Sequence, residues 1–242
     1  MPQAENNQKI MLEVKGVHAG YGGADILHGV NVHVAMGEIV VLVGPNGAGK
    51  STVMKAVFGL LNISSGTVTL DGIEITNTPP QQVVGKGVSF VPQSANVFPT
   101  LSVEENLEMG AFIRKDDFKG RIAEIYEMFP PLYDKRKLEA GSLSGGQRQM
   151  VAMGKALMID PKILLVDEPT AGLSPKYQEE ILEIVKRVNS FNVPIMMVEQ
   201  NVKQALQIAD RGYVLVDGCN RIEDTGPGLL ANAEIAEMFL GG

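Results

Sequence analysis

Residues 38–51 read EIVVLVGPNGAGKS, an apolar run that ends in a glycine-rich loop. The apolar part lacks polar alternation, and such a run ending in glycine is typical of a β-strand buried on both faces. A helical pattern begins near Lys50 and runs through KSTVMKAVFGLL, so the loop lies between a buried strand and a helix. This order of patterns predicts an α/β fold.

The loop has the spacing G-x-x-x-x-G-K-[ST] of a phosphate-binding loop. Glycines let backbone N–H groups turn inward, and a helix N-terminus carries partial positive charge, so both favour phosphate oxygens. We expect Lys50 to reach the β- and γ-phosphates of a nucleotide and the Ser51 hydroxyl to ligate Mg²⁺. A glycine-rich turn with a chance Lys-Ser pair is the alternative, and the place of the loop after a buried strand disfavours it. The predicted nucleotide contacts in this loop are Gly44, Pro45, Asn46, Gly47, Ala48, Gly49, Lys50, Ser51 and Thr52.

A second apolar run, at residues 163–168, ends in Asp167 and Glu168. A buried parallel strand delivers its last residues to the carboxyl edge of the sheet, where the phosphate loop is also expected. We therefore predict that Asp167 holds Mg²⁺ together with Ser51, and that Glu168 polarises a water for attack on the γ-phosphorus. A strand that simply ends in solvated acids is the weaker alternative beside a phosphate loop.

Length, charge and cysteine content limit the class of protein. The chain has 242 residues, a net charge of −7 and one cysteine, Cys219. A chain of this length is expected to form one domain. The acidic balance disfavours a nucleic-acid partner, and a single cysteine excludes an internal disulfide or a cysteine-based metal cluster. No apolar stretch approaches the length of a membrane span, and the polar N-terminus lacks the apolar region of a signal peptide, so we expect a cytoplasmic protein.

The remaining patterns divide the chain into two parts. Alternating apolar residues near the N-terminus predict an antiparallel β portion, and from Ser102 the pattern changes to amphipathic helices, the first opened by the capping-box pair Ser102 and Glu105. We predict one domain, 1–242, with a mixed-sheet core at about 1–92 and 156–242 and a helical subdomain at about 93–155. The strand patterns lie at 11–17, 26–34, 38–44, 66–72, 87–92, 162–169, 193–200 and 211–218.

The sequence Leu-Ser-Gly-Gly-Gln at 143–147 stands just before the third of these helices. It is a second anion-binding device, because a hydroxyl, exposed backbone donors and a helix dipole gather at one helix start. Two such devices and one nucleotide imply that one device serves another subunit's nucleotide. LSGGQ resembles the signature of the ABC ATPases, and motifs in the family's order extend this resemblance from about residue 11 to 240. The resemblance implies the P-loop NTPase fold of the ABC type and nucleotide contacts from Ser144, Gly145, Gly146 and Gln147.

The resemblance assigns roles to further positions. Tyr21 resembles the aromatic residue that stacks on adenine, with a turn-capping aromatic as the alternative, and Gln93 resembles the loop glutamine that senses Mg²⁺ and the attacking water. Ser174 stands where the D-loop of the family usually ends in Asp, which weakens any role for a carboxylate there. Gln200 stands where the family usually has a switch His. Its amide donates a hydrogen bond but cannot become charged, so we expect an active site with a reduced rate.

The motif VEQN and the ending EMFLGG make the chain resemble the ATPase subunits of branched-chain amino acid importers. The resemblance implies an ATPase that uses ATP and Mg²⁺ to power import of branched-chain or other hydrophobic amino acids. Urea or short amides are alternative substrates; a soluble ABC ATPase of translation or DNA repair, a P-loop kinase or GTPase, and a binding-only module are alternative roles. The implied partners are a second ABC ATPase subunit, identical or not, two transmembrane permease subunits and, indirectly, a solute-binding protein. The chain would lie on the inner face of the cell membrane, held there by the permease subunits.

Overall fold

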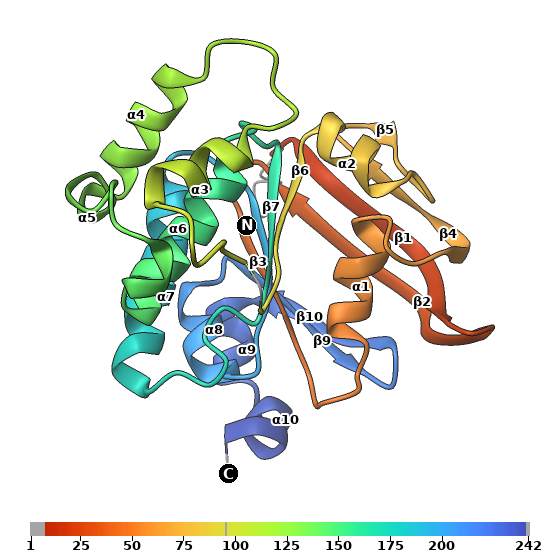
Figure 1. The fold of residues 1–242 in the computed structure, drawn as a ribbon. Helices are drawn as coiled ribbons and strands as arrows, with labels where there is room; N and C mark the ends of the chain where they lie inside the picture. The colour runs from red at the N-terminus through yellow and green to blue at the C-terminus, as the bar shows by residue number, and fades with distance from the viewer. Residues whose placement is uncertain (1–7, 95, 241–242) are drawn as a thin grey trace.

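The computed structural model describes residues 8–94 and 96–240, so the two glycines that close EMFLGG lie outside the described residues. Its centre is a six-stranded sheet in the order β10-β9-β3-β8-β7-β6 (Figure 1). Strands β9, β3, β8, β7 and β6 run parallel to one another, and β10 is antiparallel to β9. The strands of this sheet are β3 (Ile39–Val43), β6 (Val88–Val91), β7 (Ile163–Asp167), β8 (Ile195–Val198), β9 (Arg211–Val216) and β10 (Cys219–Thr225).

A second sheet is antiparallel and has the strand order β2-β1-β4-β5. The β1–β2 hairpin turns at Gly22 and Gly23, whose φ angles of 61° and 88° suit glycine. The strand that we expected at 66–72 begins earlier, because Ile63 already pairs with Ala19 of β1. The predicted mixed-sheet α/β fold with an antiparallel N-terminal portion is confirmed. The strands of this sheet are β1 (Ile10–Tyr21), β2 (Ala24–Ala35), β4 (Ile63–Leu70) and β5 (Ile73–Glu74).

Helix α1 (Lys50–Val57) lies between the two sheets (Figure 1). Val53, Met54 and Val57 of this helix are buried with apolar residues from both sheets, which fixes its start at the end of β3. We expected this helix to run to Leu61, but it ends at Val57. Gly59 takes a left-handed φ of 75°, which ends the helical conformation. This packing holds the phosphate loop at the edge where the parallel strands end.

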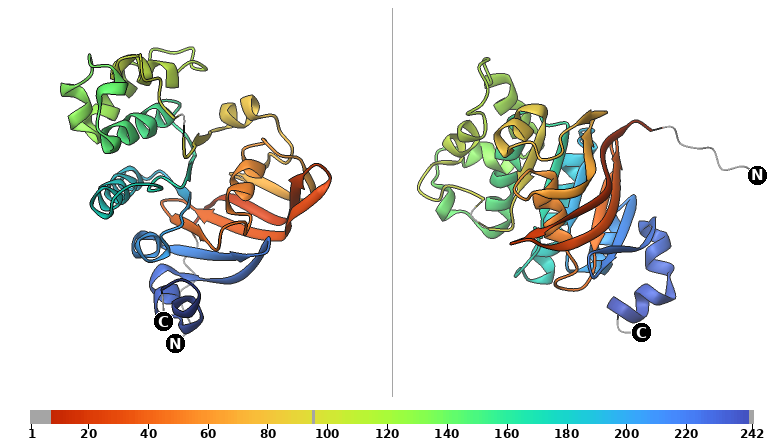
Figure 2. Two further views of the ribbon diagram at one scale, coloured as in Figure 1. Left: turned by 60° about the horizontal axis from the view of Figure 1, so that its bottom comes forward. Right: turned by 90° about the vertical axis from the view of Figure 1, so that its right-hand side faces the viewer.

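Helices cover the opposite face of the six-stranded sheet and form a second apolar core with it. A mostly helical part projects to one side of this layer (Figure 2). The capping box at Ser102 and Glu105 is observed at the start of α3. The helices of the projecting part are α3 (Val103–Gly110), α4 (Lys119–Met128), α5 (Pro130–Asp134) and α6 (Gly145–Leu157), with a 3₁₀ turn, η1, at Ala140–Ser142.

The other helices connect strands or close the chain. Four short ones were not expected from the sequence, because they bury few residues and show no helical period. Among the described residues, no helix is both long and apolar enough to cross a membrane. The connecting helices are α2 (Pro80–Lys86), α7 (Pro175–Ser190) and α8 (Val202–Ile208), and those near the C-terminus are α9 (Gly226–Ala231), α10 (Ala233–Ile235) and the π-helical turn η2 (Ala236–Leu240).

Candidate active site

The loop between β3 and α1 surrounds the ammonium group of Lys50. Lys50 Nζ donates hydrogen bonds to the backbone oxygens of Gly44 at 2.8 Å and Pro45 at 3.0 Å. The side chain is 5% exposed, and this burial lowers the pKa of the ammonium group, although the charges of Glu168 and Asp167 act to raise it. The loop therefore fixes the position of the Lys50 ammonium group at the start of α1.

Two glycines of the loop have no room for a side chain. A Cβ atom on Gly44 would lie 2.2 Å from the backbone oxygen of Leu215, and one on Gly49 would lie 2.7 Å from the side chain of Leu27. Gly49 has a φ of 95° and is the N-cap of α1, so the cap has no side chain to accept from the first N–H groups of the helix. Those N–H groups are suited to bind phosphate oxygens.

Ser51 and Asp167 join the start of α1 to the end of β7. Ser51 Oγ donates a hydrogen bond of 2.9 Å to Asp167 Oδ1. Burial raises the pKa of Asp167, while the hydrogen bond from Ser51 acts to lower it. A hydroxyl and a carboxylate are ligands that Mg²⁺ prefers. In the described part of the chain, no cluster of three or more His, Cys, Asp or Glu is suited to a metal. The pair of Ser51 and Asp167 would supply one hydroxyl and one carboxylate ligand to such an ion.

Two glutamine side chains converge on Glu168. Gln93 Nε2 donates to Glu168 Oε2 at 2.9 Å, and Gln200 Nε2 donates to the same oxygen at 2.7 Å. These residues follow β6, β7 and β8, which are neighbours in the sheet, so their carboxyl ends meet at one edge. The structure brings together the three residues that we expected to be catalytic.

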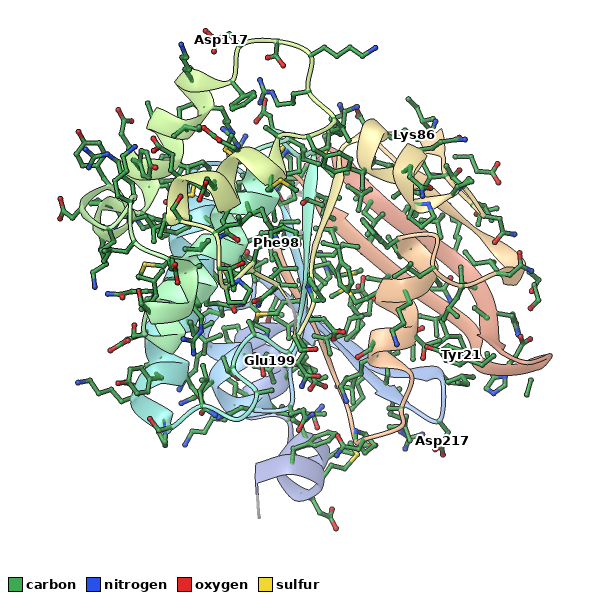
Figure 3. The ribbon with its side chains drawn as sticks, in the orientation of Figure 1. Tyr21, Lys86, Phe98, Asp117, Glu199 and Asp217 are labelled. Atoms are coloured by element: carbon green, nitrogen blue, oxygen red, sulfur yellow. The ribbon has the colours of Figure 1, made fainter. Side chains whose placement is uncertain are left out.

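Glu199 lies beside this group, and the sequence patterns did not single it out. It is 1% exposed, and its carboxylate accepts hydrogen bonds from Thr170 N (3.0 Å), Thr170 Oγ1 (2.8 Å) and Gln200 N (3.1 Å). Burial raises the pKa of Glu199, while these hydrogen bonds act to lower it. The available signal was its place after the apolar strand Ile195–Val198, which matches the place of Glu168 after β7. Figure 3 labels Glu199 near the centre of the molecule.

A cavity of about 300 Å³ opens over the phosphate loop. Tyr21 is not among the described residues that line it; its side chain is 47% exposed, and its hydroxyl accepts a hydrogen bond from Lys55 Nζ at 3.2 Å. Figure 3 shows Tyr21 near the tip of the β1–β2 hairpin, so adenine stacking by this residue stays a prediction. Among the predicted loop contacts, Ala48 is buried, and Gly44, Pro45 and Ala48 are not among the described residues that line the cavity. The cavity is lined by Ile26, Asn46, Gly47, Gly49, Lys50, Ser51, Thr52 and Glu168.

The LSGGQ segment forms the start of α6. Ser144 Oγ accepts from Gln147 N, and Gln147 Oε1 accepts from Ser144 N, both at 3.3 Å, so the two residues form a capping box. Ser144 is exposed, whereas Gly146 is buried against α7. None of the described residues that line the cavity over the phosphate loop belongs to 143–147. The exposed Ser144 at the start of α6 therefore lies outside that cavity.

Comparisons with known proteins identify several relatives of this chain. Residues 27–171 match the family model described as ABC transporter. The chain is 42% identical to the high-affinity branched-chain amino acid transport ATP-binding protein BraG of Pseudomonas aeruginosa, over 96% of this chain and 100% of BraG. It is also 42% identical to the probable branched-chain amino acid transport ATP-binding protein LivF of Archaeoglobus fulgidus, over 96% and 99% of the two chains. A crystal structure of the ADP conformation of an ATP-binding cassette of an ABC transporter superposes with a TM-score of 0.87 at 26% identity, over 96% and 99% of the two chains.

Proposed function

This chain belongs to the ABC transporter family of nucleotide-binding ATPases, and from that membership we propose that it powers a membrane importer of branched-chain or other hydrophobic amino acids. The convergence of Gln93, Glu168 and Gln200 beside the phosphate loop is the observation that carries the hydrolytic role. The substrate class rests on the identity of 42% to BraG and LivF over nearly their full lengths.

In the proposed site, the phosphate loop binds the triphosphate of ATP through its backbone N–H groups and Lys50. Ser51 and Asp167 would hold Mg²⁺, and the ion would supply positive charge to the phosphate oxygens. Glu168 accepts a hydrogen bond from the attacking water and orients it toward the γ-phosphorus. Gln93 and Gln200 position that carboxylate, and the neutral Gln200 gives a slower site than a His would. Tyr21 stacks on adenine and Gln93 also approaches Mg²⁺ in this proposal.

The proposed assembly pairs this chain with a second ABC ATPase subunit. The exposed Ser144, together with Gly145, Gly146 and Gln147, would bind the nucleotide held by that partner. Support comes from the position of this segment outside the cavity of its own phosphate loop. Two permease subunits would carry the pair on the inner face of the membrane, and a solute-binding protein would deliver the substrate to them.

Substitution of Glu168 tests the hydrolytic role. We expect Glu168→Gln to lower kcat of the assembled transporter by about 100-fold or more, the range for a positioned general base, and to retain ATP binding. Glu183→Gln, on the exposed part of α7, is the matched control and should hydrolyse ATP like the parent. A Glu168→Gln chain with the parent's kcat would contradict the assignment.

The substrate class is tested by stimulation of the reconstituted transporter with its solute-binding protein. We expect leucine, isoleucine or valine to raise ATP hydrolysis and to be taken up. Stimulation by urea or acetamide in place of these amino acids would contradict the proposed class but leave the ATPase role intact.

A further inference from the structure

Glu199 is a buried charge that the proposed chemistry leaves without a role. A buried carboxylate is costly unless hydrogen bonds compensate for lost water. Glu199 has three such bonds, all from neutral donors and two of them from backbone N–H groups. The carboxylate therefore has a specific set of partners and is not simply trapped in the core.

The three donors belong to two different loops. Thr170 lies in the loop after β7, two residues beyond Glu168, and Gln200 is the second residue of the loop after β8, next to Glu199 itself. The same loops are joined a second time, because Gln200 Nε2 donates to Glu168 Oε2 at 2.7 Å. Glu199, Thr170, Glu168 and Gln200 thus form a closed ring of chain segments and hydrogen bonds.

The loop between Glu168 and Thr170 needs such support. Glu168 has a φ of 45°, a left-handed conformation that non-glycine residues adopt at a cost and keep only where the surroundings fix it. Its N–H donates to Val198 O at 2.9 Å on one side, and Thr170, which is 2% exposed, is held by Glu199 on the other. Both anchors of the strained residue are on β8 or at its end.

We propose that Glu199 is a positioning residue, whose carboxylate holds the loop of Glu168 and the backbone of Gln200 in register so that Gln200 reaches Glu168. The inference rests on the proposed role of Glu168 in ATP hydrolysis. Glu199 is not among the described residues that line the cavity over the phosphate loop, and its carboxylate accepts its hydrogen bonds from Thr170 and Gln200. It acts through its two neighbours.

This geometry requires that both carboxylate oxygens of Glu199 accept hydrogen bonds. Glu199 Oε1 faces Thr170 N, and Oε2 faces Thr170 Oγ1 and Gln200 N. A glutamine at this position has one oxygen and one NH₂ group, which only donates. In either orientation, the NH₂ group faces a backbone N–H, either that of Thr170 or that of Gln200. One of these two hydrogen bonds is therefore lost, while the shape of the side chain is kept.

The test is Glu199→Gln in the assembled transporter, measured with Mg·ATP. We expect kcat to fall about tenfold or more, because small misplacements of reacting groups have effects of this size. The Kd for ATP should stay within about twofold of the parent value, since phosphate binding uses other residues. Combining Glu199→Gln with Gln200→Ala should lower kcat no further than the more severe of the two single changes.

Three controls separate positioning from general stability. Thr170→Val removes the hydroxyl donor and should lower kcat in the same direction, whereas Thr170→Ser keeps the hydroxyl and should restore it. Glu38→Gln changes another buried glutamate, bonded to Ala35 N at 2.8 Å and to Arg211, and should lower Tm without changing kcat. If Glu199→Gln does not fold, the comparison of kcat between Thr170→Val and Thr170→Ser tests the proposal.

The proposal is overturned if Glu199→Gln has the parent's kcat, or if kcat, ATP affinity and Tm fall together as they would for a purely structural residue. It is also overturned if Thr170→Val and Thr170→Ser have equal kcat values. Failure of Glu168→Gln to lower hydrolysis would instead contradict the proposed function, so the two ideas fail on different variants.

Discussion

At the scale of single residues, the charged forms of Lys50 and Asp167 are destabilised by burial in the site. Burial lowers the pKa of Lys50 and raises the pKa of Asp167, so each group is shifted toward its neutral form. Mg²⁺ would supply a positive charge beside Asp167, and the phosphates would supply negative charge beside Lys50. Active sites commonly carry such a cost in stability, and it should be measurable here.

We predict that Asp167→Asn raises Tm of the ligand-free chain, by about 2 °C or more at pH 7, while weakening Mg·ATP binding. A carboxylate whose pKa is higher in the folded chain destabilises the fold as pH rises from the unfolded-state pKa toward the folded-state pKa, because the unfolded chain releases the proton first. The gain should therefore shrink as pH is lowered toward about 4, the pKa in the unfolded chain. Calorimetry in EDTA measures both quantities. A Tm difference that is independent of pH would show that the charge is not the cause.

At the scale of elements, two helices begin with the same capping chemistry but in different surroundings. Ser102 and Glu105 cap α3, and Ser144 and Gln147 cap α6. We predict that Ser102→Ala lowers Tm by about 2–4 °C, the effect of ~1 kcal/mol in a chain of this size, and leaves ATP turnover unchanged. Ser144→Ala should cost similar stability but also lower turnover of the assembled transporter. Equal turnover in the two variants would make Ser144 a structural cap only.

Elements with a regular apolar pattern could be predicted from the sequence, and their arrangement could not. β3, β7 and α1 follow directly from patterns in which nearly every apolar residue is buried. α2 buries only Val83, and the exposed edge strand β10 alternates without a strong apolar face, so neither had a clear signal. The family resemblance predicted a role for Gln93 and a role for Gln200 separately, without indicating that the two side chains meet. Their meeting at Glu168 depends on strand order, which is a long-range property of the sheet.

At the scale of the whole molecule, the two anion-binding devices sit on different parts of the fold. The phosphate loop lies at the edge where the parallel strands end, and the exposed start of α6 belongs to the mostly helical part that projects to one side (Figure 2). A second ATPase subunit in head-to-tail orientation would bring the α6 start of each chain to the phosphate loop of the other. Association should then depend on the nucleotide, because in the proposed assembly both segments would bind the γ-phosphate.

We predict that Glu168→Gln, which should bind ATP without hydrolysing it, doubles its mass in Mg·ATP, alone or with the companion ATPase subunit, and remains a monomer in ADP. Adding Ser144→Arg should abolish this association, since a long side chain at the α6 start blocks the approach of the partner's nucleotide. ATP affinity should remain that of a monomer, because Ser144 does not line its own cavity. Ser65→Arg, at an exposed position of β4, is the matched control and should associate normally. Light scattering after size exclusion distinguishes these cases, and association that survives Ser144→Arg would contradict a nucleotide pocket shared between two subunits.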